Sequence, residues 1–264
     1  MSGPERIAAA FAASGKRAAL MPYVMGGYPT LEESLRIAQA CVDAGADIIE
    51  LGVPFSDPLA DGPVIQAAGG AALAAGADLA GVLRVAEQLA KQLPVVLMCY
   101  ANMVFAPGAL AFCERLAQTG ASGLIVPDLP PEEGEPVLAA CRQTGLSFVP
   151  LVAPTTTPER MRLVGSRADG FLYAVSLVGT TGERSSLPET FGEVIAHARA
   201  ASPVPVALGF GIATPEQALQ AAQAGADGVI VGTRLVRAAG EGDDPAASVG
   251  ALVGEFAAAL SAGR

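Results

Sequence analysis

The chain contains 264 residues, of which 52% are hydrophobic and only 16% charged, so its composition excludes an intrinsically disordered protein. Its formal net charge of -10 repels polyanions, and no basic stripe offsets that charge, which makes nucleic acid a poor candidate partner. No uncharged apolar stretch reaches about 18 residues, and the N-terminal segment has the pattern of a short helix instead of a signal peptide. We therefore expect a soluble cytoplasmic protein without a membrane segment.

The cysteines give no indication of a metal site or a disulfide. The chain has 4 of them, at Cys41, Cys99, Cys113 and Cys141, without C-x-x-C spacing. Each lies inside an apolar helix or strand pattern, where a reduced thiol is ordinarily buried. We predict four free thiols.

A repeated local pattern organises the chain. A helical stretch ends at a glycine, a few small or polar residues follow, and an apolar run then begins, as around Gly45, Gly120, Gly145 and Gly225. Glycine just past the last helical residue is a common helix stop. Continuous apolar runs are typical of strands covered on both faces, as in a parallel sheet. The pattern therefore predicts alternating strands and helices.

The repeat predicts eight strand and helix units. The strands are expected at about 19–25, 47–52, 94–100, 122–127, 146–152, 170–175, 204–209 and 227–232. The helices are expected at about 30–44, 78–92, 107–119, 132–144, 158–166, 188–201, 214–224 and 245–260. Eight such units favour a closed (β/α)8 barrel, formed by a single domain over residues 1–264. An open doubly wound sheet is the alternative, but G-x-G-x-x-G is absent after the first strand.

The end of the second strand carries the first candidate for catalysis. Ile48 and Glu50 lie two apart and so point to the same face of a strand, which places a carboxylate in the core. A buried carboxyl has a raised pKa and can give and accept protons near neutral pH, so Glu50 is a candidate general acid/base. A structural ion pair or cap is the alternative. For Asp61, in Asp-Gly-Pro, a helix-capping turn and a functional role are equally supported.

Other strand ends carry polar or small residues. Tyr23, Tyr100 and Tyr173 are candidate substrate-binding residues, because active sites of such barrels lie at the C-terminal ends of the strands. Glycines near the ends of the last three strands suggest a phosphate site, although strand-to-helix turns also need glycine. Residues 233–237 are short enough to form the extra helix found in such sites. The Gly-, Ser- and Thr-rich segment after the sixth strand is a candidate lid.

Several kinds of chemistry are disfavoured by residues that the chain lacks. Its two lysines, Lys16 and Lys91, precede strands and so belong to the opposite end of the barrel, which disfavours a Schiff base. The one histidine, His197, falls within a predicted helix, so a histidine-ligated metal is excluded. No G-x-S-x-G motif or Cys/His pair offers a nucleophile. Acid/base chemistry by carboxylates remains.

Five motifs carry a resemblance to a known family. They are ELGVPFSDPLADGPVIQ from Glu50, YANMVF from Tyr100, PDLPPEE from Pro127, GFGI from Gly209 and GVIVGT from Gly228. In this order the chain resembles the α subunit of tryptophan synthase over essentially its whole length. The resemblance implies a (β/α)8 barrel with an extra N-terminal helix, here at about 5–13. It also implies a lyase that reversibly cleaves indole-3-glycerol phosphate to indole and D-glyceraldehyde 3-phosphate.

The resemblance also implies roles for individual residues. Glu50 would be the general acid/base that moves a proton at indole C3, and Asp61 would stabilise the indole N–H as positive charge develops. Tyr173 would line the substrate pocket. The implied phosphate-binding residues are Gly182, Gly211, Gly232 and Thr233, and Thr181 would belong to the lid.

The chain departs from the family pattern in two segments. Where the family commonly has S-R-x-G-V-T-G after the sixth strand, residues 176–182 read SLVGTTG and lack the arginine. Where many members have T-L-G-D-P after the first strand, residues 25–29 read MGGYP. Both departures concern loops, and neither changes the two carboxylates.

The family resemblance implies a partner. It is a tryptophan synthase β chain, a pyridoxal-phosphate protein that would receive indole in an α2β2 heterotetramer, while this chain would need no cofactor. We expect contacts from residues 55–60 and 102–107, where Phe105 is an apolar residue in a loop. Two alternatives are a different phosphate-binding barrel enzyme and a non-catalytic subunit that only activates its partner. In the second alternative Glu50 and Asp61 would be structural.

Overall fold

The strands in the described part of the chain belong to one parallel sheet. The computed structural model describes residues 1–175, 191–209 and 211–262. Its strand order is β5-β4-β3-β2-β1-β9-β8-β7-β6. The strands are β1 (Ala19–Met25), β2 (Ile49–Gly52), β3 (Val95–Met98), β4 (Gly123–Ile125), β5 (Ser147–Phe148), β6 (Leu151–Val152), β7 (Leu172–Val175), β8 (Val206–Gly209) and β9 (Gly228–Val231).

The two edges of this sheet, β5 and β6, are halves of the single strand expected at 146–152. Only Val149 and Pro150 separate them. The Val149 N–H donates to Leu124 O of β4 at 3.0 Å, and the Tyr173 N–H of β7 donates to Pro150 O at 3.1 Å. The sheet therefore closes on itself, and the predicted (β/α)8 barrel is confirmed. The described residues contain nine strand segments instead of eight because proline has no N–H to continue the ladder.

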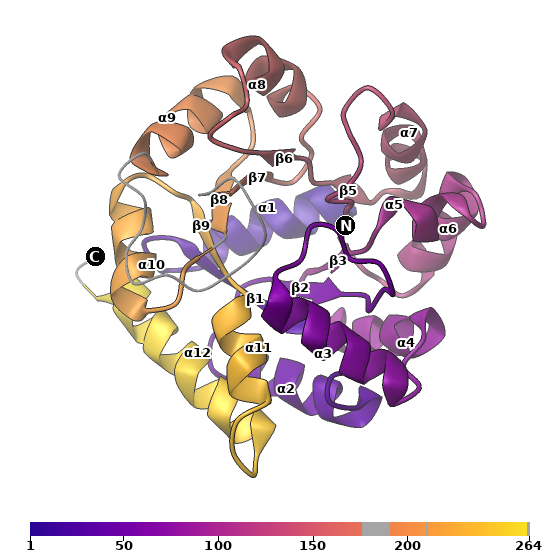
Figure 1. Cartoon of the computed structure of the whole chain (residues 1–264). Helices are drawn as coiled ribbons and strands as arrows, with labels where there is room; N and C mark the ends of the chain where they lie inside the picture. Colours follow the sequence, from indigo (N-terminus) through magenta and orange to yellow (C-terminus); the bar gives the residue numbers. More distant parts are fainter. Residues whose placement is uncertain (176–190, 210, 263–264) are drawn as a thin grey trace.

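Helices surround this sheet (Figure 1). They are α1 (Gly3–Ala13), α2 (Leu31–Asp43), α3 (Pro63–Ala74), α4 (Leu79–Leu89), α5 (Ala101–Phe105), α6 (Ala109–Gln118), α7 (Glu135–Thr144), α8 (Pro158–Gly165), α9 (Phe191–Ala201), α10 (Pro215–Gln223), α11 (Thr233–Ala239) and α12 (Pro245–Ser261). The sequence pattern missed α3 and α5. Gly69 and Gly70 weaken the helical pattern of α3, and α5 is too short to show a period.

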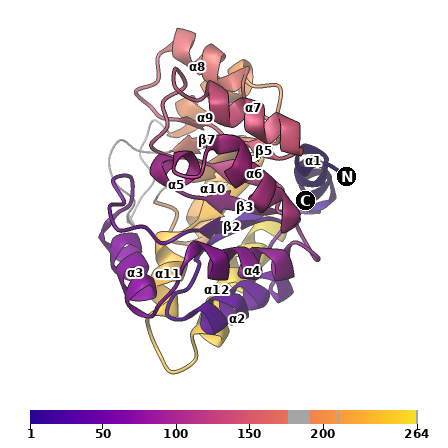
Figure 2. The same ribbon diagram turned by 90° about the vertical axis from the view of Figure 1, so that its right-hand side faces the viewer.

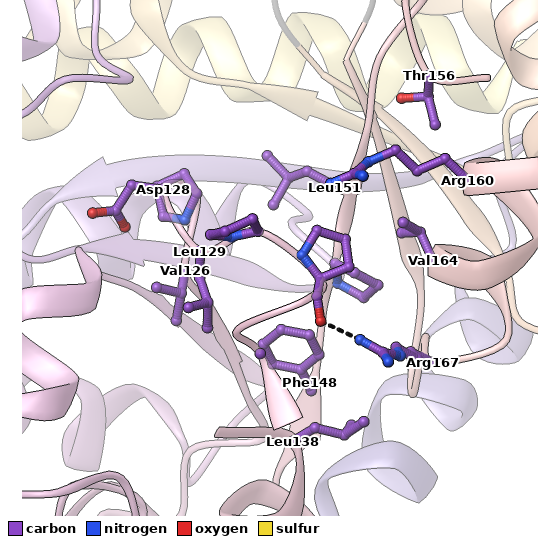
Figure 3. Close-up of a pocket in the computed structure, with 15 residues that line it drawn as sticks. Val126, Asp128, Leu129, Leu138, Phe148, Leu151, Thr156, Arg160, Val164 and Arg167 are labelled. Atoms are coloured by element: carbon purple, nitrogen blue, oxygen red, sulfur yellow. Dashed lines mark hydrogen bonds between the residues drawn. The ribbon is translucent and has the colours of Figure 1, made fainter. Parts of the chain in front are cut away.

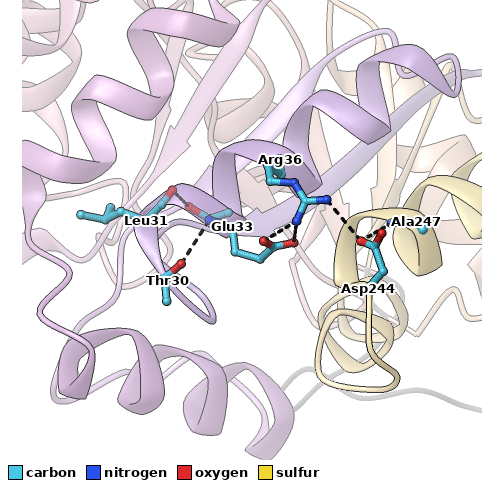
Figure 4. Close-up of polar contacts among 7 residues, drawn as sticks. Thr30, Leu31, Glu33, Arg36, Asp244 and Ala247 are labelled. Carbon is cyan, nitrogen blue, oxygen red and sulfur yellow. Dashed lines mark hydrogen bonds and ion pairs between the residues drawn. The ribbon is translucent and has the colours of Figure 1, made fainter.

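Helix α12 follows the last strand and packs against α2, which completes the ring of helices. A Cβ atom on Gly250 of α12 would lie only 3.2 Å from the Cβ of Ala40 in α2, so the two backbones approach closely. Their N-terminal ends are also linked (Figure 4). The Arg36 guanidinium pairs with Glu33 at 2.8 Å and with Asp244 at 3.5 Å. Asp244 in turn caps α12 by accepting the Ala247 N–H at 3.2 Å.

The interior of the barrel is filled by eight apolar side chains, each of which lies in a strand or within one residue of a strand end. These buried residues are Met21, Ile48, Val96, Ile125, Val149, Phe171, Ala207 and Ile230. Helix α1 closes the end of the barrel where the strands begin, and it passes behind the sheet in Figure 1. Its Ile7 is fully buried in the same cluster. Its Arg6 donates to the carbonyls of Ala90 at 2.5 Å and Leu93 at 3.1 Å, just before β3.

Helices α3 and α1 lie toward opposite ends of the barrel, as Figure 2 shows. Within the described ranges, no single helix has the length and apolar character needed to cross a membrane. Helices α3 and α4 meet that criterion only as a pair, bent by 107°.

The packing of α1 gives the first testable prediction. Ile7→Ala should lower the free energy of unfolding by about 2–5 kcal/mol, because it leaves a cavity beneath the barrel interior. Urea titration followed by circular dichroism measures this change. The exposed Ala9→Ser in the same helix is the control and should cost less than about 0.5 kcal/mol. Equal effects of the two substitutions would show that α1 does not close the barrel.

Candidate active site

A polar layer lies directly on the apolar layer of the barrel interior. Tyr23, Glu50, Tyr173, Gly209 and Gly232 each stand two residues beyond a member of the apolar layer. Successive side chains of a strand alternate between faces, so these residues share its interior face. Tyr23 and Glu50 are also direct neighbours in the register of β1 and β2. The strand pattern alone thus gathers the candidate residues at the C-terminal end of the barrel.

Glu50 is a buried carboxyl group in the barrel interior. Its side chain is 1% exposed, and its Oε2 atom has no hydrogen-bond partner among the described residues. Burial, and then the negative charge of Asp61, raise the pKa of Glu50 to about 8. The structural alternative of an ion pair or cap is not observed in the described part of the chain. Near neutral pH the group can both donate and accept a proton.

Asp61 lies in the same site, and its carboxylate is not a helix cap. The residue is 4% exposed, and Oδ1 has no hydrogen-bond partner in the described structure. The N-cap of α3 is Gly62, which has no side chain to cap the helix. Burial raises the pKa of Asp61 to about 6, and a hydrogen bond with Tyr100 acts in the opposite direction. Of the two possibilities left open by the sequence, the geometry favours the functional one.

Tyr100 connects Asp61 to the loop that follows β2. Its hydroxyl oxygen accepts the Ala60 N–H at 3.2 Å, and its ring stacks on Phe55 with ring centroids 5.2 Å apart. Phe55 was expected only as a partner contact. Its place against Tyr100 is a feature that the sequence pattern did not reveal, because the two residues are far apart in the chain.

Tyr23 and Tyr173 complete the walls of the site. Burial raises the pKa of both hydroxyls well above the usual tyrosine value, and the charges of Glu50 and Asp61 add to this effect. A Cβ atom on Gly52 would overlap the Tyr23 hydroxyl, and one on Gly209 would overlap that of Tyr173. These glycines therefore make room for the tyrosine side chains. The sequence pattern does not show this role, because each glycine meets its tyrosine only in the folded chain.

The expected phosphate-binding residues fall partly within the described structure. Gly232 precedes α11, whose first residue is the largely buried Thr233. The first N–H groups of a helix have no partner inside the helix and can bind an anion. Gly211 has a φ of 89°, in the left-handed region that favours glycine, and follows β8, the neighbour of β9. Thr181 and Gly182, the predicted lid and phosphate-binding residues, lie outside the described residues.

The remaining predictions concern residues away from the site. Lys16 pairs with Asp47 at 2.9 Å just before β1, at the end of the barrel opposite the carboxylates. His197 is exposed on α9. All four cysteines are buried and free, as predicted. Among the described residues, no group of histidine, cysteine and carboxylate side chains could hold a metal ion.

Comparison with known proteins identifies the family. The family model described as tryptophan synthase alpha chain matches residues 10–260. The chain belongs to this family. A tryptophan synthase alpha chain from Gloeobacter violaceus is 46% identical over 241 residues, covering 90% of this chain and 87% of the relative. One from Methanosarcina mazei is 48% identical over 229 residues, covering 87% and 84%.

Solved structures agree with this assignment. A chain of Mycobacterium tuberculosis tryptophan synthase is 41% identical, with a TM-score of 0.90 and coverage of 98% of this chain and 99% of that one. A chain from the tryptophan synthase α2β2 complex of Pyrococcus furiosus is 34% identical, with a TM-score of 0.85 and coverage of 91% and 98%. As a tryptophan synthase alpha chain, the protein is the indole-producing lyase of tryptophan biosynthesis and works with a β chain.

The raised pKa of Glu50 predicts how stability depends on pH. Between the unfolded value of 4.5 and the folded value of about 8, the folded state holds more protons, so stability falls as pH rises through this window. Each unit of pKa difference corresponds to about 1.4 kcal/mol. The amide of Glu50→Gln does not titrate. The free energy of unfolding of this variant, relative to that of the wild type, should therefore rise by several kcal/mol as the pH goes from 4 to 9.

Urea unfolding at each pH measures this difference. The exposed Glu255→Gln in α12 is the control, and its difference from the wild type should stay flat. A flat difference for Glu50→Gln as well would mean that the Glu50 carboxyl is not held in its neutral form by burial.

Proposed function

We propose that Glu50 and Asp61 carry out the cleavage of indole-3-glycerol phosphate in this chain. The observation that supports this most directly is the pair of buried carboxyl groups, each with an oxygen that has no partner among the described residues. Their pKa values, about 8 for Glu50 and about 6 for Asp61, give them different protonation states at neutral pH. Two titratable groups with separated pKa values are well suited to separate acid/base and electrostatic roles.

Glu50 and Asp61 are the only protein groups to which the proposed reaction assigns a chemical step. The protonated Glu50 carboxyl gives its proton to indole C3, and the positive charge that develops on the ring is stabilised by the Asp61 carboxylate at the indole N–H. The glycerol hydroxyl next to the ring then loses its proton to Glu50, and the electrons of the C–C bond return to the ring. Indole and D-glyceraldehyde 3-phosphate result. The ring is its own electron sink, so we propose that this chain needs no cofactor.

The other candidates position the substrate in this proposal. Tyr23, Tyr100 and Tyr173 surround the two carboxyl groups and provide flat apolar surfaces for the indole ring. The phosphate would bind backbone N–H groups at Gly211, Gly232 and Thr233, and we extend this set to Gly182, with Thr181 in the lid, on the resemblance alone. Backbone donors suit a chain whose net charge is -10, because they bind an anion without lysine or arginine.

Single substitutions of the carboxyl groups test the proposal. Glu50→Gln should lower the rate of indole formation by about a thousandfold, because an amide cannot transfer the proton. Asp61→Asn should lower it by about a hundredfold, because the charge at the indole N–H is lost. Indole release is measured with a β chain present, and co-elution with that chain should be unchanged. Wild-type activity in Glu50→Gln would instead support a non-catalytic subunit that activates its partner.

We further propose that the chain forms an α2β2 heterotetramer with a β chain that holds pyridoxal phosphate. Two exposed apolar side chains support this surface, one in the loop after β2 and one in α5, a short helix where the sequence had suggested a loop. Leu59 is 82% exposed in the loop after β2, and Phe105 is 42% exposed at the end of α5, after β3. Ala60, next to Leu59, bonds to Tyr100 and so links this surface to Asp61.

Charged substitutions test the partner surface. Leu59→Asp combined with Phe105→Asp should weaken association with the β chain by at least about a hundredfold, since both place a charge in an apolar interface. Titration calorimetry measures the affinity. Leu163→Asp is the matched control, because Leu163 is also apolar and 40% exposed, but lies on α8. An equal loss in the control would contradict this choice of surface.

A further inference from the structure

A cavity lies between α7 and α8, beside the ends of β4 and β6 (Figure 3). Its volume is about 470 Å³, within the range of pockets that bind small molecules. It is lined by the loop before α7, by residues at the break between β5 and β6, and by α8 and the residues just after it. None of the candidate catalytic, substrate-binding or phosphate-binding residues lines it.

The walls of this α7–α8 cavity are mainly apolar and rigid. Leu138 of α7, Phe148 of β5, Leu151 of β6 and Val164 of α8 contribute aliphatic and aromatic surface. Four prolines, at positions 127, 130, 131 and 150, restrict the backbone around it. Such walls fit a compact aromatic or branched aliphatic body.

Two arginines give the cavity a cationic side. Arg160 forms a fork with the Glu132 carboxylate, with distances of 2.6 and 2.9 Å. Arg167 donates to the Pro131 carbonyl. A guanidinium has five N–H groups, so both arginines keep donors that have no partner among the described residues. In a chain with 16 basic and 26 acidic residues, two arginines on one cavity are a notable concentration of positive charge.

Glu132 already shows what Arg160 can bind. Their pair is exposed, with side-chain exposures of 43% for Arg160 and 57% for Glu132, so little stability depends on it. A ligand carboxylate can share or take this position. Asp128 lies on the opposite side of the cavity in Figure 3 and accepts the Ala101 N–H at 2.8 Å. Its negative charge disfavours a second anionic group on the ligand.

We propose that the α7–α8 cavity is a second ligand site, which binds a small monocarboxylate with an aromatic or branched apolar body. The carboxylate contacts Arg160 and Arg167, and the body contacts Leu138, Phe148 and Val164. This inference goes beyond the proposed function and does not depend on the roles of Glu50 and Asp61.

Two substitutions with opposite expected effects on ligand affinity test the site. The probe is 2-naphthoate, and its affinity for the full chain is measured by titration calorimetry. Arg160→Gln should weaken binding by about tenfold or more, because a charged hydrogen bond is lost. Glu132→Gln should tighten binding, because it removes the competing carboxylate. Arg162→Gln, on the same helix but outside the cavity, should leave the affinity within about twofold. Thermal unfolding without the probe checks that each variant is folded.

Probe chemistry separates this site from others. Neutral 2-naphthamide and doubly charged 2,6-naphthalenedicarboxylate should both bind more weakly than 2-naphthoate. Saturating indole with D-glyceraldehyde 3-phosphate should leave 2-naphthoate binding unchanged, since these compounds occupy the catalytic site. The proposal is overturned if 2-naphthoate does not bind or if the reaction products displace it. It is also overturned if Arg160→Gln and Arg162→Gln bind 2-naphthoate equally, or if Glu132→Gln weakens its binding. Loss of indole formation in Glu50→Gln is an independent result.

Discussion

The burial of two carboxyl groups, Glu50 in the barrel and Asp61 in the loop that follows β2, is the constraint on which the site depends. Taking Glu50 and Asp61 out of water costs free energy, and this burial raises both pKa values. The negative charge of Asp61 raises the pKa of Glu50 further. The apolar layer beneath them, closed below by Ile7, offsets this cost through its own burial. The raised pKa of Glu50 keeps a proton available near neutral pH.

The loop after β2 joins this chemistry to the surface. Tyr100 bonds to Asp61 and accepts the Ala60 N–H, and its ring stacks on Phe55. Leu59, beside Ala60, is largely exposed. The hydrogen bond with Tyr100 lowers the Asp61 pKa, so the position of the tyrosine affects the charge in the site. One short segment therefore holds both an exposed apolar side chain and the residue that bonds to Tyr100.

The break between β5 and β6 shapes a different part of the molecule. Pro150 interrupts the strand, and the residues on either side, Phe148 and Leu151, line the cavity between α7 and α8. Arg160 and Arg167 hold the loop before α7 across this region through Glu132 and Pro131. The polar layer of the barrel and this cavity differ in chemistry, because the first contains the Glu50 carboxyl and the second contains two arginines.

The sequence by itself determined the alternation of strands and helices apart from α3 and α5, because glycine stops and apolar runs are local patterns. It also marked Glu50, because the spacing from Ile48 determines the face of the strand. Only the tertiary structure decided that Asp61 is free of a capping role and that Gly52 makes room for Tyr23. It also decided where Pro150 splits a strand. The physical reason is that periodicity depends on near neighbours in the chain, whereas burial, pKa and close contacts depend on residues that only folding brings together.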